Sequence, residues 1–254
     1  MKAVAVIPAR FASTRFPGKP LAADTGKYLI QHVYERACQA SSVDRVIVAT
    51  DDERIRQAVE SFGGEAVMTR ADHESGTDRI GEVIAGVECD LVVNLQGDEP
   101  EIEPGHVDRL VALLAGDNES GIATLACPFA VLEGANPADP NAVKVVLDAR
   151  SRALYFSRAM IPHPRIHKTT GALHQPAPYL LHLGIYAYRR EVLLDLAGLA
   201  PTPLERTEKL EQLRWLEHGQ RIVVALVDHA AVGVDSPDDY RAFVERHRRS
   251  ANVA

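Results

Sequence analysis

The 254-residue sequence predicts an α/β fold in which helices flank a mostly parallel, mixed sheet. Short apolar runs rich in β-branched residues alternate with stretches of helical period, the pattern of successive strand–helix–strand units. The clearest strands are expected at 4–7, 45–49 and 91–95. From about residue 142 the alternation of strands and helices gives way to shorter strand candidates. This change indicates an inserted lobe within a single domain.

Helices between the first strands are predicted from the spacing of apolar residues. Ile55, Val59 and Phe62 recur at i, i+4 and i+7, so they place one face of a crossover helix against the sheet. Two further helices are expected to begin after Thr77 and at Pro104, since proline is favoured in the first helical turn.

The second half is predicted to contain four more strands and two helices. The strands are expected at 143–147, 153–156, 183–188 and 221–227. One amphipathic helix is expected over 204–216, with its leucines facing inward. Ser236 is expected to cap another helix, because a proline and two acidic residues follow it.

Composition excludes several classes of protein. The hydrophobic fraction of 46% and the charged fraction of 25% are those of a globular protein. The net charge of −7 argues against a general nucleic-acid binder, so an anionic ligand would need a local basic cluster. Three scattered cysteines are too few for a disulfide framework or a zinc site and fit a reducing compartment. Apolar runs are too short for a membrane span.

A basic loop at 8–20 follows the first predicted strand. Arg10, Arg15 and Lys19 place cations at the carboxyl end of that strand, where open α/β sheets bind ligands. Small residues and hydroxyls between them would let backbone amides approach phosphate oxygens. The spacings of a Walker A loop and of a dinucleotide fingerprint are both absent. The loop therefore predicts a phosphate site of another kind, with a solvated basic loop as the alternative.

Two acidic residues each end an apolar run. Asp98 follows the strand predicted at 91–95, and Asp235 precedes the helix that begins after Ser236. Either could simply shape its turn. Together they offer two hard oxygen ligands, which suits a magnesium ion that takes its remaining ligands from water and substrate phosphates. Patterns typical of softer metals, such as His-Glu-x-x-His, are absent.

Ordered motifs over nearly the whole chain resemble the 3-deoxy-manno-octulosonate cytidylyltransferase family. The motifs lie at 7–21, 68–79, 93–100, 141–148, 153–162, 182–188, 204–213 and 233–237. One of them could be accidental, but the ordered set is specific. The sequence departs mildly from the family pattern at Phe16 and Tyr28, and nothing familiar is found in 166–178.

The resemblance implies a GT-A-like nucleotidyltransferase fold formed by residues 1–254, with an embedded acceptor and dimerisation lobe at about 129–215. It implies transfer of CMP from CTP to 3-deoxy-D-manno-octulosonate (Kdo), giving CMP-Kdo and pyrophosphate for lipopolysaccharide biosynthesis. It also implies Mg²⁺ as cofactor, a cytoplasmic location and a homodimer, with neither nucleic acid nor membrane as partner.

Site residues are carried over from the family by position. The triphosphate would be held by Arg10, Ser13, Arg15 and Lys19, and the metal by Asp98 and Asp235; of these, Arg10, Lys19, Asp98 and Asp235 are the catalytic candidates. The nucleoside pocket would include Ala9, Ser75 and Arg79. The acceptor site would include Gln96, Arg158, His182, Tyr186, Glu211 and Gln212. Without the resemblance, the acceptor residues of strands and helices would be read as ordinary core or surface residues, and Arg158 as a surface arginine in a salt bridge.

Three alternatives remain open at this stage. A related acidic sugar, such as 8-amino-Kdo or sialic acid, could be the acceptor. A catalytically silent nucleotide-binding module would keep the basic loop but would not need paired metal carboxylates. An NAD-dependent oxidoreductase is disfavoured because the glycine fingerprint is missing.

Overall fold

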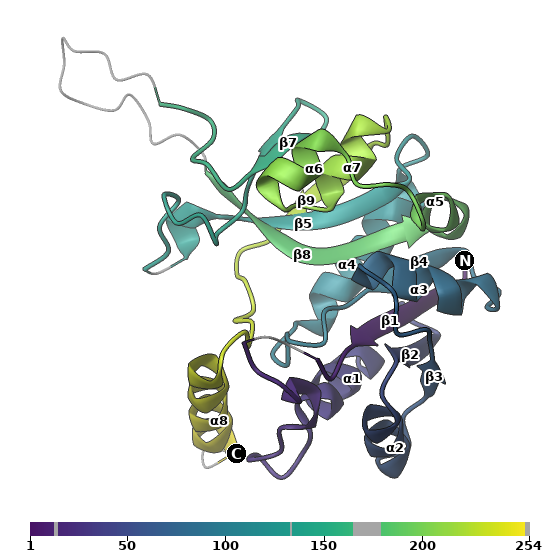
Figure 1. The fold of residues 1–254 in the computed structure, drawn as a ribbon. Helices are drawn as coiled ribbons and strands as arrows, with labels where there is room; N and C mark the ends of the chain where they lie inside the picture. The colour runs from purple at the N-terminus through teal and green to yellow at the C-terminus, as the bar shows by residue number, and fades with distance from the viewer. Residues whose placement is uncertain (13–14, 133, 165–178, 252–254) are drawn as a thin grey trace. The chain divides into compact units, whose positions relative to one another are not determined.

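The computed structural model describes residues 1–12, 15–132, 134–164 and 179–251 (Figure 1). These residues belong to two compact units. The first unit is built from Met1–Ala112, Ala187–Gly198 and Ala231–Ala254, and the second from Leu113–Tyr186 and Leu199–Ala230. The bounds of the second unit differ from those of the lobe expected at about 129–215.

The first unit contains a parallel sheet whose strands follow the order β3, β2, β1, β4. Their bounds are β1 Ala3–Ala9, β2 Arg45–Thr50, β3 Ala66–Met68 and β4 Leu91–Asn94. Val6 at the centre of β1 pairs with Ile47 on one side and Asn94 on the other. Four consecutive residues of β1 from Val4 are fully buried, as expected for a strand covered on both faces. The strands predicted at 4–7, 45–49 and 91–95 are confirmed.

The helices of the first unit are α1 Leu29–Cys38, α2 Glu53–Ser61, α3 Gly76–Ala85, α5 Arg190–Leu196 and α8 Pro237–Ala251. A 3₁₀ turn, η1, spans Lys19–Leu21. Helix α4 Pro104–Gly116 begins in the first unit and continues into the second. The predicted helices that carry Ile55 and Val59, that start at Pro104 and that follow Ser236 are confirmed, and the helix expected after Thr77 begins earlier, at Gly76. Side chains of Asp52 and Ser75 accept hydrogen bonds from the first turns of α2 and α3, which stabilises these helix starts. Helix α1 and strand β3 were not predicted.

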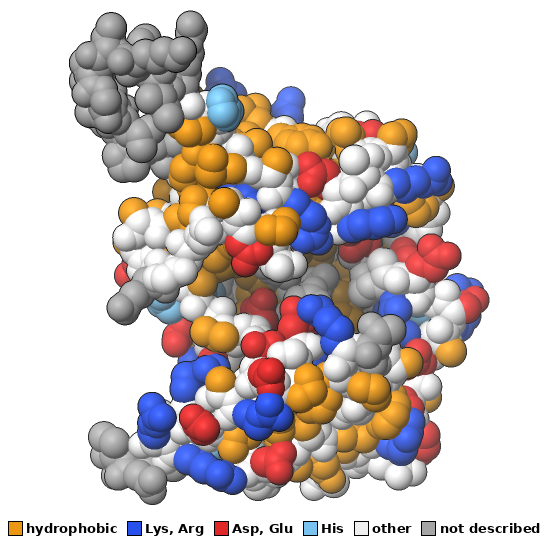
Figure 2. All heavy atoms as spheres, turned by 60° about the vertical axis from the view of Figure 1, so that its left-hand side comes forward, with side chains coloured by type: hydrophobic (Ala, Val, Ile, Leu, Met, Phe, Trp, Pro, Cys, Tyr) orange, Lys and Arg blue, Asp and Glu red, His pale blue; other side chains and the backbone are white. Residues whose placement is uncertain are grey.

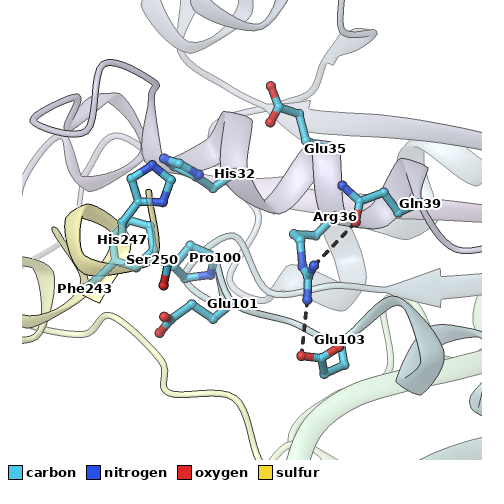
Figure 3. Close-up of a pocket in the computed structure, with 10 residues that line it drawn as sticks. All are labelled: His32, Glu35, Arg36, Gln39, Pro100, Glu101, Glu103, Phe243, His247 and Ser250. Atoms are coloured by element: carbon cyan, nitrogen blue, oxygen red, sulfur yellow. Dashed lines mark hydrogen bonds and ion pairs between the residues drawn. The ribbon is translucent and has the colours of Figure 1, made fainter. Parts of the chain in front are cut away.

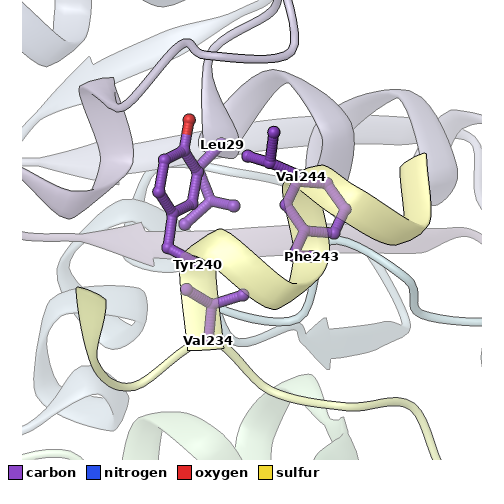
Figure 4. Packing of buried hydrophobic residues seen from close by; sticks show 5 residues of the cluster. All are labelled: Leu29, Val234, Tyr240, Phe243 and Val244. Atoms are coloured by element: carbon purple, nitrogen blue, oxygen red, sulfur yellow. The ribbon is translucent and has the colours of Figure 1, made fainter. Parts of the chain in front are cut away.

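Helix α8 packs on α1 through a buried apolar cluster (Figure 4). The cluster comprises Leu29, Val234, Tyr240, Phe243 and Val244, with Phe16 and Ala22 packed against it. Burying each of the larger side chains contributes about 1.5–3 kcal/mol. Because the cluster joins the chain on both sides of Lys19 to the residue before Asp235, it fixes two functional segments against each other.

The second unit contains β5 Ile122–Pro128 parallel to β9 Ile222–Leu226, and an antiparallel group formed by β6 Lys144–Leu147, β7 Ala153–Ser157 and β8 Leu180–Arg189. A short 3₁₀ turn, η2 Phe129–Val131, follows β5. The end of β8 continues into the first unit. The strands predicted at 143–147, 153–156, 183–188 and 221–227 are confirmed, whereas β5 was not predicted.

The single helix predicted over 204–216 is wrong. Two short helices, α6 Pro203–Glu208 and α7 Gln212–Glu217, occupy this stretch. Lys209 separates them because it adopts the left-handed conformation with φ 55°, and its N–H donates to the carbonyl of Glu205 at 2.7 Å. The apolar period continues through the break, so spacing alone did not reveal it.

Charged side chains of both signs are interspersed over the face shown in Figure 2, and the described residues on it form no continuous basic surface. This distribution agrees with the argument from net charge against a nucleic-acid binder. None of the helices in the described part of the chain is long and apolar enough to cross a bilayer.

Candidate active site

A pocket of about 380 Å³ lies in the first unit, beyond the carboxyl ends of β1 and β4. It is lined by Pro8, Ala9, Arg10, Ala12, Arg15, Lys19, Pro20, Gln96, Gly97, Asp98 and Asp235. The pocket therefore brings together the basic loop and the two acidic residues that the sequence singled out. Open α/β sheets bind ligands at this edge.

Lys19 connects the two predicted metal ligands. Its Nζ donates to Asp98 Oδ2 at 2.9 Å and to the main-chain carbonyl of Val234 at 2.8 Å. The same nitrogen lies 3.8 Å from Asp235 Oδ1. The carboxylates of Asp98 and Asp235 thus converge on one cation, although one follows β4 and the other precedes α8.

Two arginines of the basic loop lie in the same pocket. Arg15 pairs with Asp235 through an Nη2–Oδ1 distance of 3.0 Å, and both side chains are more than half exposed. Arg10 is half-buried and lines the pocket directly after β1. Ser13, the remaining predicted phosphate ligand, lies outside the described residues. The described part of the loop therefore presents cations where a polyanion would enter.

The local backbone explains why these segments meet. Gly18 has φ 71°, a conformation that favours glycine, and a Cβ added there would lie 3.1 Å from the Phe11 ring. Gly97 packs so tightly that a Cβ would lie 3.1 Å from the Pro8 carbonyl oxygen. On the other side, Val234 N–H donates to the Asp98 carbonyl at 2.8 Å. These contacts hold the basic loop, the end of β4 and the segment before α8 close together.

Glu99, which directly follows Asp98, has a shifted pKa that the sequence reasoning missed. Burial raises the pKa of its carboxyl group to about 8, and the neighbouring Asp98 carboxylate acts in the same direction. Glu99 is therefore mostly protonated at neutral pH and adds little charge beside Asp98. Its position directly after Asp98 was the available signal, but burial could not be read from the sequence.

The residues of the site fit a magnesium ion. The described residues contain no group of three or more His, Cys, Asp or Glu side chains that could hold a metal. Magnesium, however, usually takes one or two protein carboxylates and completes its shell with water and phosphates. Asp98 and Asp235 supply two carboxylates that already share a cation, and their side chains are 32% and 52% exposed.

Ser75 and Arg79, predicted for the nucleoside pocket, lie at the start of α3 and contact other protein groups. Ser75 Oγ caps α3 by accepting from Asp78 N–H at 3.0 Å. Arg79 is fully buried, where its Nη2 lies 2.8 Å from Asp51 Oδ2 and its Nη1 donates to Thr69. Ala9 is buried at the end of β1 and lines the pocket. The nucleoside-binding roles of these residues stay predictions.

Among the predicted acceptor residues, Gln96 lines the pocket of the first unit, and its Nε2 donates to Asn94 Oδ1 at 3.2 Å. The others belong to the second unit. His182 and Tyr186 lie there in a chain of aromatic contacts, with ring centroids 5.4 Å apart. The ring of Phe156 extends this chain from His182 and that of Trp215 extends it from Tyr186.

His182 is uncharged in this cluster. Burial lowers its pKa to about 3. Its Nε2 lies 3.1 Å from Thr124 Oγ1, whose hydroxyl donates to the Ile185 carbonyl at 2.8 Å. The same hydroxyl also lies 3.1 Å from the Leu183 carbonyl oxygen. The aromatic packing of His182 and its contact with Thr124 account for its position without a role as a general base.

Arg158 braces the junction between α6 and α7. Its guanidinium donates to the carbonyls of Glu208 at 2.7 Å and Pro140 at 3.0 Å, with a longer contact of 3.4 Å to Lys209. The main-chain N–H of Arg158 donates to the Glu208 carboxylate at 2.9 Å. Within the described residues this side chain closes no salt bridge, and recognition of an acceptor by Arg158 stays a prediction.

Lys144 and Glu208 complete this brace and were not predicted. The buried ammonium of Lys144 donates to the carbonyls of Asp139 and Arg158 at 2.9 and 2.6 Å. Glu208 also accepts from Ser157 Oγ at 2.6 Å. The brace fixes the main chain just before the last two predicted acceptor residues, half-buried Glu211 and buried Gln212 at the start of α7.

A second cavity of the first unit, about 320 Å³, lies beside α1 and α8 (Figure 3). Three glutamates face it, and each has a basic partner: Glu35 pairs with Lys27, Glu101 with Arg246 and Glu103 with Arg36. The charges of this cavity are thus balanced within the protein. The pocket at the strand ends remains the better candidate for a charged substrate.

Comparison with known proteins agrees with the geometry of that pocket. A family described as cytidylyltransferase matches residues 4–222. The 3-deoxy-manno-octulosonate cytidylyltransferase of Syntrophotalea carbinolica is 53% identical over 98% of this chain and 99% of its own length. The 3-deoxy-manno-octulosonate cytidylyltransferase of Geobacter metallireducens is 49% identical over 98% of this chain and 99% of its own length. A solved structure of CMP:2-keto-3-deoxy-manno-octonic acid synthetase complexed with CTP is 47% identical, with a TM-score of 0.90 over 98% of this chain and 100% of that one.

Proposed function

Since this chain belongs to the 3-deoxy-manno-octulosonate cytidylyltransferase family, we propose that it transfers CMP from CTP to Kdo and releases pyrophosphate. The observation that carries the proposal is the convergence of the basic loop with Asp98 and Asp235 in one pocket at the strand ends. This arrangement combines cations for a triphosphate with carboxylates for a metal. The GT-A-like nucleotidyltransferase fold agrees with it.

The reaction asks the protein mainly to position two anions. The anomeric 2-hydroxyl oxygen of Kdo attacks the α-phosphorus of CTP, a new P–O bond forms, and the bond to the departing pyrophosphate breaks. The hydroxyl proton is lost to solvent. Arg10, Arg15 and Lys19 would hold the triphosphate and offset the charge that develops on the leaving group. These cations act electrostatically, so the step needs no histidine.

Magnesium is part of this proposal. Asp98 and Asp235 would hold the ion, and their convergence on Lys19 supports that assignment. When bound, magnesium would reduce the repulsion between the substrates and acidify the attacking hydroxyl. The carboxylates also orient Lys19 and Arg15 at the pocket entrance.

We also propose the homodimer, the cytoplasmic location and the role in lipopolysaccharide biosynthesis that the family resemblance implies. Val131, Leu154 and Leu204 are exposed apolar side chains of the second unit that an interface between copies would bury. Sedimentation equilibrium of the purified protein tests the dimer, since a monomer at micromolar concentration would contradict it.

The test of the activity is pyrophosphate release from CTP and magnesium with Kdo, 8-amino-Kdo and sialic acid compared in parallel. We expect release with Kdo and a product with the mass of CMP-Kdo. Faster release with 8-amino-Kdo or sialic acid would assign the enzyme to that sugar. Binding of CTP without release for any sugar would identify a silent nucleotide-binding module and overturn the proposal.

A further inference from the structure

Lys19 has an unusually complete set of acceptors for a residue expected to bind phosphate. Its ammonium donates to Asp98 and to the Val234 carbonyl, and it lies within 3.8 Å of Asp235. Its side chain is only 13% exposed, against 32% for Asp98 and 52% for Asp235. The ammonium is thus directed at Asp98, the Val234 carbonyl and Asp235 rather than at solvent.

We infer that Lys19 stands in for a divalent cation between these carboxylates while no nucleotide is bound, and that it thereby makes metal binding depend on the triphosphate. The inference rests on the proposed function, because it assigns Lys19 to the carboxylates first and to phosphate afterwards. Two neighbouring carboxylates repel each other unless a cation offsets their charge. An ammonium at contact distance also repels a divalent cation, so the pair accommodates one or the other.

The loop allows Lys19 to change partners without unfolding. Its main chain is held on both sides, since Gly18 N–H donates to the Phe11 carbonyl at 3.0 Å and Ala22 N–H donates to the Lys19 carbonyl at 3.1 Å. The side chain beyond Cα has a flexible four-carbon stem. A triphosphate in the pocket would attract the ammonium, as it would Arg15, which is paired with Asp235.

This exchange couples two binding events. If the triphosphate draws Lys19 away, the carboxylates gain affinity for a divalent cation. By reciprocity, the metal raises the affinity for the nucleotide by the same factor. Lys19 is then a positioning residue that favours loading of the metal together with CTP over loading of the metal alone.

Mn²⁺ binding followed by electron paramagnetic resonance tests the inference without turnover, because no acceptor sugar is present. Free Mn²⁺ is measured with and without CTP, and a titration of CTP alone corrects for Mn²⁺ that it binds in solution. We expect the wild type to bind Mn²⁺ at least tenfold more weakly without CTP. Lys19→Met should bind Mn²⁺ alone at least tenfold more tightly than the wild type, with a smaller gain from CTP.

Lys27→Met is the matched control, since Lys27 pairs with Glu35 at 2.6 Å and is 45% exposed. The inference is overturned if Lys19→Met binds Mn²⁺ no more tightly than Lys27→Met, or if CTP leaves the wild-type affinity unchanged. The wild-type comparison needs no variant, so an unchanged wild-type affinity overturns the inference even if Lys19→Met does not fold. Absence of pyrophosphate release with every sugar would refute the proposed activity alone, because it leaves the Mn²⁺ result intact.

Discussion

Arg79 and Asp51 form a buried ion pair, with Nη2 2.8 Å from Oδ2 across 28 residues of sequence. The arginine side chain is fully buried and that of Asp51 is 18% exposed. The pair ties the start of α3 to the end of β2, close to the strand ends that form the pocket. Removing one partner leaves a poorly solvated charge, which is costly.

We therefore expect Arg79→Met to lower the free energy of unfolding by about 3 kcal/mol. Urea unfolding of wild type and variant measures the change. Arg70→Met is the control, because Arg70 and its partner Asp72 are 69% and 74% exposed and such pairs contribute less than about 1 kcal/mol. Equal losses of unfolding free energy in the two variants would show that the buried pair stabilises the protein no more than the exposed pair does.

Asp98→Asn and Asp235→Asn should each lower kcat by about 100-fold or more, since a neutral amide is a poor magnesium ligand. Both variants should remain folded, because the apolar cluster around Val234 is untouched. Steady-state kinetics at saturating CTP and Kdo measures the effect. Asp238→Asn is the control: this residue lies on α8, is 79% exposed and pairs with Arg241. Full activity in a folded Asp98 or Asp235 variant would remove that residue from the metal site.

The sequence predicted the first sheet and the pocket well because both depend on local pattern. Buried strands are continuous apolar runs. Arg10 and Lys19 lie in the loop after β1, and Asp98 lies in the loop after β4. Long-range partners could not be predicted in this way. Glu208 meets Arg158 across 50 residues, and only the folded chain brings them together.

Local conformation also limited the prediction. Lys209 ends α6 in the left-handed region, yet the leucines on either side keep helical spacing, so the break was invisible in the pattern. Helix α1 was missed although Leu29, Ile30 and Val33 are fully buried, because no capping side chain marks its start. Burial likewise gives Arg79 a partner, Asp51, that residue type alone did not indicate.

CTP should be used in preference to ATP and GTP, because a pocket shaped for a pyrimidine excludes a larger base sterically. The likeness to a structure complexed with CTP supports this expectation. Pyrophosphate release with Kdo and each nucleotide at equal concentration measures the preference. Equal turnover with ATP would contradict the assignment of the nucleotide.

His182 should make the protein less stable in acid. Its folded pKa of about 3 lies below the unfolded value of 6.5, so the unfolded chain binds the extra proton between these values. Its contribution is complete above pH 6.5 and is lost progressively as the pH falls toward 3. Between pH 7 and 5 the loss amounts to about 2 kcal/mol.

Urea unfolding of His182→Gln and wild type at pH 7, 6 and 5 isolates this contribution. His32, whose pKa burial lowers to about 4, and Glu99, whose raised pKa acts in the opposite direction, affect both proteins equally. The stability difference should shrink by about 2 kcal/mol between pH 7 and 5. The exposed His218→Gln serves as control. A difference that stays constant with pH would show that His182 titrates normally.

Arg158→Ala should lower kcat/KM for Kdo at least about tenfold, because a charged hydrogen bond contributes about 1.5–3 kcal/mol. The guanidinium fork matches a carboxylate, and its bonds to the Glu208 and Pro140 carbonyls hold it in one orientation. CTP affinity should change much less. The measurement varies Kdo at saturating CTP and determines CTP binding directly in the same folded variant. Arg206→Ala, an exposed change on α6, should leave both quantities unaltered.

Arg158→Lys is a second variant, since lysine keeps the charge but lacks the planar fork that reaches several carbonyls, and kinetics compared with stability separates recognition from bracing. If Arg158 contacts Kdo, both variants should raise KM for Kdo while the free energy of unfolding falls by only about 1–3 kcal/mol. If the brace alone matters, both variants should lose stability while kcat/KM for Kdo at a temperature well below unfolding stays at the wild-type value. That result, or a loss confined to CTP binding, would remove Arg158 from the acceptor site and leave it as a support for the junction before Glu211.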